Sequence, residues 1–178
     1  MVRRFLIGLV LSVVAVARLA VADPEEPYIG LAYGEIGLHQ FGQQTTQRPG
    51  MVLARFGDDL SPLFGVEAHL AMGANSATVS SGGVSESYRL YSLVSAFAKP
   101  QIKFHSFSIY GLAGLAQWRT RLNEPGLAHI WSTDHSGAFG AGVQVPFTTS
   151  GKWVFDASYV RLHSSASYAI AGVNYRFP

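Results

Sequence analysis

The 178-residue sequence contains no cysteine, and only 13% of its residues are charged. The absence of cysteine excludes disulfide bonds, thiolate metal sites, thiol catalysis and a lipid anchor on a cysteine. Hydrophobic residues make up 48% of the chain, aromatic residues 12%, and there are 19 glycines. A soluble domain typically has about 25% charged residues. The composition therefore indicates a chain that meets lipid as well as water.

The first 22 residues have the pattern of a secretory signal peptide. Two arginines form a basic start, residues 5–17 form an apolar run, and Ala20-Val21-Ala22 has the A-x-A form that a signal peptidase cleaves. The apolar run is shorter than the roughly 20 residues that a membrane-spanning helix requires. We therefore expect a signal peptide over residues 1–22 and an exported domain over residues 23–178.

Removal of the signal peptide changes the charge of the chain. Arg3, Arg4 and Arg18 would leave with it, so 10 of the 13 basic residues remain against 11 acidic residues. The exported domain is then close to neutral, and nucleic acid is not an expected partner.

After residue 23 the sequence alternates between apolar and small or polar residues in segments of about ten. Val66, Leu70 and Met72, for example, alternate with Glu67 and His69. Strands that cross the outer membrane have about this length, with apolar side chains toward lipid and small or polar ones toward the lumen. The pattern predicts an all-β fold, an eight-stranded antiparallel up-and-down transmembrane β-barrel. The expected strands are residues 28–38, 51–58, 64–73, 88–98, 106–118, 137–147, 153–162 and 168–177.

The connections between these segments differ in length. Bacterial barrels have short periplasmic turns and longer extracellular loops. With an even number of strands, both termini are expected in the periplasm and the long loops outside the cell. The short connections are residues 59–62, 99–105 and 148–152, the long ones are 40–48, 74–86 and 119–135, and the fourth loop, 162–167, is short. The second long loop is rich in Ser and Gly, and we expect it to be mobile.

A soluble β-sandwich would also consist of many short alternating strands. Two features favour the barrel. The face opposite the apolar one carries Gly, Ala, Ser and isolated charges rather than a second apolar core. Aromatic residues on the apolar face fall near strand ends, where membrane-interface girdles lie: Tyr33, Trp118, Trp153 and Tyr175.

The last predicted strand carries Val173, Tyr175 and Phe177 on one face. An aromatic residue after alternating hydrophobic ones resembles the C-terminal insertion signature of bacterial outer-membrane proteins, although Pro178 follows Phe177 here. Four segments also resemble, in order, the last four strands of the small OmpX/Ail/Lom family of OmpA-like, porin-family outer-membrane barrels. They begin at Ser108 (SIYGLAGL), Gly140 (GAGVQ), Phe155 (FDASY) and Gly172 (GVNYRF).

This resemblance implies a non-enzymatic surface barrel that acts in adhesion, host interaction or envelope integrity. It implies a monomer in the bacterial outer membrane, in contact with lipid and lipopolysaccharide and without a cofactor. A host-surface or extracellular protein could bind the second and third loops. Arginine and tryptophan are frequent in binding hot spots, and in the third loop we expect contacts from Arg119, Arg121, His129 and Trp131.

The lumen of an eight-stranded barrel is just wide enough for side chains to fill it. Buried charges there should pair with one another. We expect an ion-pair network of Arg55, Glu67 and Asp156 that extends to Arg176. Its expected role is structural, with a gate or proton path as the alternative.

Two other functions remain open at this point. His163 and Ser165 resemble the catalytic pair of the lipid A deacylase barrels, but no Asp or Glu follows Asp156 to orient the histidine. A small pore is the third possibility. No metal site is expected, because the spacing of His129 and His135 fits no trusted ligand pattern.

Overall fold

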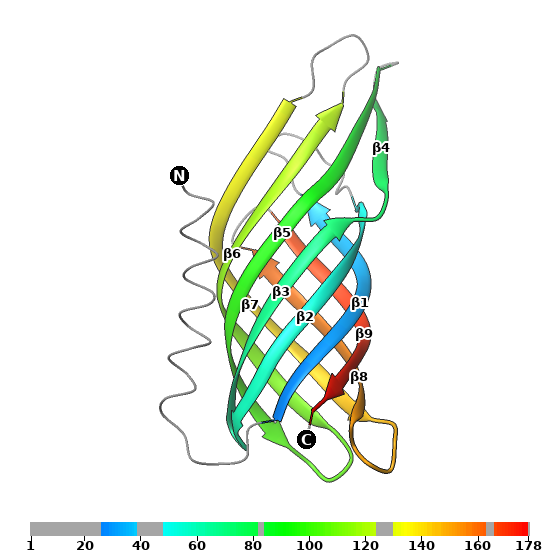
Figure 1. Cartoon of the computed structure of the whole chain (residues 1–178). Helices are drawn as coiled ribbons and strands as arrows, with labels where there is room; N and C mark the ends of the chain where they lie inside the picture. Colours follow the sequence, from blue (N-terminus) through cyan, green and yellow to red (C-terminus); the bar gives the residue numbers. More distant parts are fainter. Residues whose placement is uncertain (1–25, 39–47, 82–83, 124–129, 163–165, 178) are drawn as a thin grey trace.

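The computed structural model describes residues 26–38, 48–81, 84–123, 130–162 and 166–177. All regular elements in these ranges are β-strands (Figure 1), and none of the described residues forms a helix long and apolar enough to span a membrane. The strands are β1 (Glu26–Leu38), β2 (Gly50–Ser61), β3 (Phe64–Gly73), β4 (Ser76–Ser81), β5 (Val84–Lys103), β6 (Ser108–Asn123), β7 (Ile130–Pro146), β8 (Trp153–Leu162) and β9 (Ala166–Arg176).

Eight of these strands close into a barrel. Each pairs antiparallel with its neighbours, β3 pairs with β5, and β1 pairs with β9 from Tyr28 opposite Arg176 to Leu38 opposite Ala166. Closure leaves no free edge around the wall, so the backbone groups are bonded between strands and the wall can lie in lipid. The predicted fold class, an eight-stranded antiparallel barrel, is confirmed.

The two faces of each strand differ as the alternation predicts. On β3, Glu67 and His69 are buried in the lumen, whereas Leu70 and Met72 point outward and are exposed. Exposed apolar side chains recur around the outside of the barrel. A soluble sandwich would bury them against a second sheet, whereas a transmembrane barrel turns them toward lipid.

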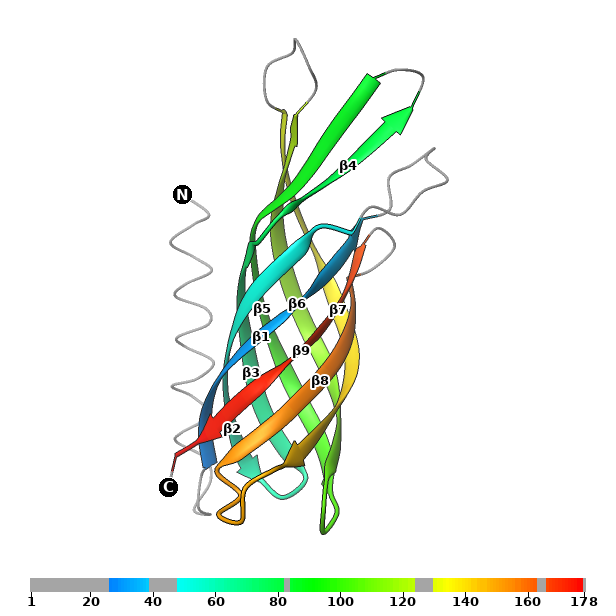
Figure 2. The same ribbon diagram turned by 90° about the vertical axis from the view of Figure 1, so that its right-hand side faces the viewer.

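The short connections β2–β3, β5–β6 and β7–β8 lie at one end of the barrel, together with the start of β1 and the end of β9 (Figure 1). We call this the turn end. At the opposite end, β4, β5, β6 and β7 continue beyond the rim as a protruding sheet (Figure 2). We call this the extension end.

The predicted bounds of β3 and β8 agree with the structure, but the second and third loops were predicted wrongly. Residues 76–81 form β4, which pairs with β5, and residues 119–122 on β6 pair with residues 130–133 on β7. These segments are rich in Ser, Thr and Arg and lack the apolar alternation over about ten residues that marks the strands of the wall. They form strands because pairing with a neighbour satisfies their backbone groups.

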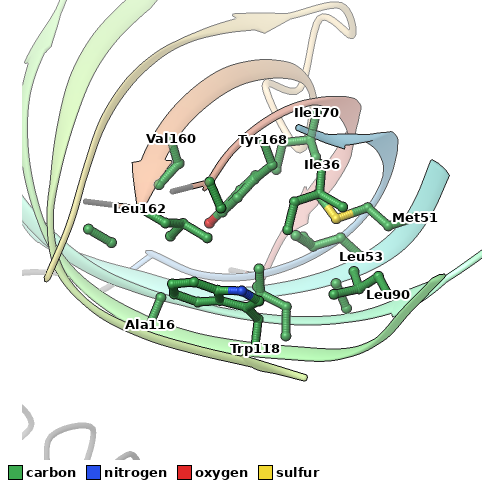
Figure 3. Close-up of a cluster of buried hydrophobic side chains, with 14 of the residues drawn as sticks. Ile36, Met51, Leu53, Leu90, Ala116, Trp118, Val160, Leu162, Tyr168 and Ile170 are labelled. Atoms are coloured by element: carbon green, nitrogen blue, oxygen red, sulfur yellow. The ribbon is translucent and has the colours of Figure 1, made fainter. Parts of the chain in front are cut away.

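The lumen contains two layers. The half toward the extension end is filled by apolar side chains that meet across the barrel, among them Met51, Leu53 and Trp118 (Figure 3). The expectation of a lumen with only small residues and isolated charges is therefore wrong for this half. Trp118 is only 4% exposed and lies inside the lumen instead of in a girdle, whereas Tyr33 and Trp153 do point outward, 54% and 45% exposed.

Two glycines on β6 provide a test of how closely the strands pack. A Cβ added to Gly114 would lie 1.9 Å from the carbonyl oxygen of Ala96 on β5, whereas at Gly111 the nearest atom would be Pro100 Cγ at 3.5 Å. We expect Gly114→Ala to lower the stability of the barrel by about 1–3 kcal/mol, because the β5 backbone must shift. Gly111→Ala is the matched control and should fold like the parent.

The measurement is the urea concentration at which the compact, heat-modifiable band disappears from gels of the refolded protein. Equal midpoints for the Gly114→Ala and Gly111→Ala variants would contradict the packing argument.

Candidate functional site

The predicted lumen charges meet in the half of the barrel toward the turn end. Arg55 on β2 lies between Glu67 on β3 and Asp156 on β8. Its Nε is 3.4 Å from Glu67 Oε1, its Nη1 contacts Asp156 Oδ1, and its Nη2 donates to Ser158 Oγ at 3.3 Å. Arg55, Glu67 and Asp156 are fully buried, so these charges interact with one another and not with water.

Hydrogen bonds complete the surroundings of the two carboxylates. Asp156 accepts from the Tyr110 hydroxyl at 2.8 Å, from Gln144 Nε2 at 2.8 Å and from Asn174 Nδ2 at 3.2 Å. Glu67 accepts from the Tyr28 hydroxyl, and its Oε1 is 2.5 Å from His69 Nε2. Each carboxylate thus has several donors, as a buried charge requires.

A second group of charges lies nearer the turn end. Lys99 Nζ donates to Asp59 Oδ1 at 3.0 Å and to the Tyr28 hydroxyl at 2.9 Å. Asp59 Oδ2 is 3.2 Å from Lys103 Nζ and 3.5 Å from Arg176 Nη2. Lys99 and Asp59 were missed because the expected strands stopped before them. Both continue the alternation of inward residues, and this signal could have revealed them.

Arg176 is connected to the network indirectly, through Gln144. Its Nη2 donates to Gln144 Oε1 at 3.0 Å, and Gln144 in turn donates to Asp156. The structure therefore brings together Arg55, Glu67 and Asp156 directly, and Arg176 through Gln144. Toward the extension end the polar contacts lead to Tyr168, whose hydroxyl is 2.8 Å from His69 Nδ1, and there the apolar layer begins.

Three of the four expected loop residues can be placed, and they form a cluster on the outside of the protruding sheet. The Arg119 guanidinium carbon is 4.4 Å from the centroid of the Trp131 ring, and that of Arg121 is 5.5 Å from it. Tyr91 packs edge-on against Trp131, with ring centroids 5.1 Å apart. Tyr91 was not expected, because it lies at an irregularity in the β5–β6 pairing between Leu90 and Ser92 that the alternation does not show. His129 lies outside the described residues.

The C-terminal signature lies on the outside of the barrel at the turn end. The Tyr175 ring packs against Trp153 and Phe177, with centroids 5.0 Å and 5.2 Å apart. The Phe177 amide donates to the Pro27 carbonyl at 2.8 Å, so the pairing with the first strand continues to this residue. Val173 pairs with Leu31 on the same strand. A role in insertion remains a prediction.

The residues of the deacylase alternative, His163 and Ser165, lie outside the described residues. Within the ranges that the structure describes, no three His, Asp or Glu side chains gather as metal ligands would.

Comparison with known proteins agrees with the fold. The solved structures that resemble the chain include Ail of Yersinia pestis, solved with the heparin analogue sucrose octasulfate (TM-score 0.54, 21% identity, 86% of this chain and 97% of that chain). They also include Neisserial surface protein A (0.53, 16%, 86% and 97%) and the N-terminal barrel of Pseudomonas aeruginosa OprF (0.55, 19%, 85% and 97%). No curated protein sequence matches the chain.

The family described as "Outer membrane protein beta-barrel domain" matches residues 6–177, which is nearly the whole chain. The barrel, its lipid-facing apolar wall and this match all agree. The chain therefore belongs to the outer membrane protein beta-barrel domain family and is a bacterial outer-membrane protein.

Proposed function

We propose that this protein is a non-enzymatic surface barrel whose protruding sheet, β4–β7, binds partners outside the cell in adhesion or host interaction. The observation that carries the proposal is the edge of that sheet. Residues 130–135 of β7 are exposed, and residues 130–137 pair with β6, whereas the β7–β8 pairing starts only at Ala138 opposite Leu162. Among the described strands, therefore, β6 alone pairs with this part of β7.

A strand edge of this kind can pair with an extended segment of another protein. Its unpaired amide and carbonyl groups supply the affinity, and the flanking side chains supply the selectivity. The exposed Trp131 and the hydroxyl groups of Ser132 and Thr133 would flank such a segment. Ail, which shares the fold, was solved with a sulfated ligand, and heparin is therefore a second probe besides a cell surface.

The lumen supports a structural role more than a catalytic or conducting one. The buried carboxylates of Glu67 and Asp156 are paired with Arg55, and that of Asp59 is paired with Lys99. Both ring nitrogens of the buried His69 are already engaged, Nε2 by Glu67 and Nδ1 by the Tyr168 hydroxyl. The apolar layer with Trp118 also argues against the small pore, since water needs polar partners in a channel this narrow.

The test replaces residues 119–134 by a short Gly/Ser turn, which removes the outer parts of β6 and β7 but keeps the barrel wall. Cells expressing this variant should adhere to epithelial monolayers and to immobilised heparin no better than cells without the protein. Replacing residues 148–151, at the turn end, by Gly/Ser is the matched control and should leave adhesion unchanged.

Heat-modifiable migration in gels verifies that both variants form barrels. Adhesion of the shortened variant at the parent level would refute the adhesion proposal. If that result came with a new sensitivity of the cells to detergent, envelope integrity would be the remaining role.

A further inference from the structure

The protruding sheet has an open strand edge on each of its two sides. On one side is β7, whose residues 130–135 pair with β6 alone among the described strands. On the other side is β4, which pairs with β5 alone in the described part of the chain. Ser76 and Thr78 on β4 are exposed, as are residues 130–135 of β7. Both edges lie at the extension end, on opposite margins of one sheet (Figure 1).

Neither edge carries the features by which natural proteins protect an exposed strand. Lysine, proline and bulges on an edge strand hinder the approach of a second sheet. The sequence of β4 is SATVSS, which contains neither charge nor proline. Residues 130–135 of β7 read IWSTDH, again without lysine or proline, and their register with β6 is regular. Both edges can therefore accept a further strand.

The side chains along the two edges are compatible with each other. Ser76 on β4 and Trp131 on β7 lie in one row across the sheet, because each pairs with the next strand in that row. Since side chains alternate with a period of two, Thr78 and Thr133 lie on this same face. Hydroxyl side chains on neighbouring strands stabilise a pair through hydrogen bonds. A sheet that joined β4 to β7 would therefore bring hydroxyl groups together.

Strand direction determines which edges can meet in one membrane. β4 runs away from the barrel and β7 runs back toward it (Figure 2), because each of the pairs β4–β5, β5–β6 and β6–β7 is antiparallel. All copies in a membrane have the same orientation relative to it. β4 of one copy beside β7 of another copy is therefore an antiparallel pair, whereas two β4 or two β7 strands would be parallel. Antiparallel pairing is the slightly more stable of the two and continues the pattern of the sheet.

From this geometry we infer that the protein self-associates in its own membrane, with the β4 edge of one copy paired to the β7 edge of the next. The partner is a second copy of this chain, in contrast to the monomer that the family resemblance implied. The contact joins two different surfaces, so further copies can add to the edges that stay open. The inference rests on the same open edge of β7 as the adhesion proposed above, and a copy whose β7 edge is covered cannot offer it to an outside partner.

The absence of cysteine allows a cross-linking test in the full protein. Thr78→Cys on β4 and Thr133→Cys on β7 place thiols at exposed positions on the same face of the proposed joint sheet. The two variants carry different tags, are expressed together in one cell and are treated with a short flexible bismaleimide, which tolerates a shift of register. We expect a cross-linked dimer that contains both tags.

Each variant expressed alone is the matched control. Its thiols lie on edges that do not meet in the proposed contact, so it should give little dimer. Accidental collisions in the membrane would cross-link two like thiols as readily as two unlike ones. Heat-modifiable migration verifies that both variants form barrels.

A second variant separates self-association from adhesion. Replacing residues 76–86 by a short Gly/Ser turn removes β4 and leaves the β7 edge in place. Two differently tagged copies of the parent should co-purify in mild detergent, and two copies of this variant should lose that co-purification. Cells that express the variant should still adhere as well as cells with the parent, since their β7 edges are free.

Three results would overturn the inference: no mixed dimer from folded variants, like dimers as abundant as mixed dimers, or undiminished co-purification without β4. Cross-linking between cells but not within one cell would also overturn it, and would assign the edges to contact between cells. Mixed dimers in a protein that fails the adhesion test would support the inference and refute only the adhesion proposal.

Discussion

Replacing Arg55 by alanine is expected to destabilise the barrel by about 3–5 kcal/mol, because it leaves buried carboxylates without their counter-charge. Arg55 is 0% exposed and contacts both Glu67 and Asp156. Lys99 is the nearest other cation to Glu67, with its Nζ 4.0 Å away, and it is already bonded to Asp59. Urea titration of the refolded protein, followed by heat-modifiable migration, measures the loss.

Adding a second substitution separates charge from packing. In Arg55→Ala/Glu67→Gln one of the two uncompensated carboxylates becomes a neutral amide, so part of the lost stability should return. Arg89→Ala, which removes an exposed arginine, is the control and should change the midpoint little. A midpoint for Arg55→Ala equal to that of the parent would mean that the network contributes no stability.

Replacing Trp118 by alanine is the second large effect. The side chain lies in the apolar layer of the lumen together with Leu53 and Leu90 (Figure 3). Truncation of a buried tryptophan removes many contacts and leaves a cavity, which costs about 3–5 kcal/mol. The same urea titration measures this change.

Trp153→Ala is the matched control, because Trp153 points outward at the turn end and is 45% exposed. It should destabilise the barrel much less than Trp118→Ala. If the two variants were equally stable, Trp118 would not lie in a packed lumen.

Planar-bilayer conductance provides a further readout for the apolar layer. The parent should not conduct, because the layer gives water no polar partners. Trp118→Ala should conduct more than the parent. Steady conductance in the parent would contradict this expectation and support the hypothesis that the protein is a small pore.

The sequence by itself determined the fold class and the side of the wall on which most charges lie. Strand residues alternate with a period of two, so once Leu70 and Met72 are assigned to lipid, Glu67 and His69 must face the lumen. The same rule placed Arg55 and Asp156 inside. Because an isolated buried charge is costly, the inward positions of these residues also predicted that charges of opposite sign would pair.

The pattern could not show where strands end beyond the membrane. In the wall, apolar and polar residues alternate because one face meets lipid. Residues 119–121 and 130–135 are exposed or half-buried whichever way they point, so the alternation disappears although the strand pairing continues. The pattern therefore predicted the protruding sheet, with its cluster of Arg119, Arg121 and Trp131, only as loops.

Tertiary structure alone decided which partners the inward residues meet. Arg55 and Asp156 are far apart in the sequence, and their contact depends on the closure of the barrel between β1 and β9. The direction of the Trp118 side chain was also decided only by the tertiary structure. On β6 both faces carry apolar residues, so the alternation does not decide which way Trp118 points. In the folded barrel Trp118 points into the lumen, where it packs in one buried cluster with Leu53 and Leu90.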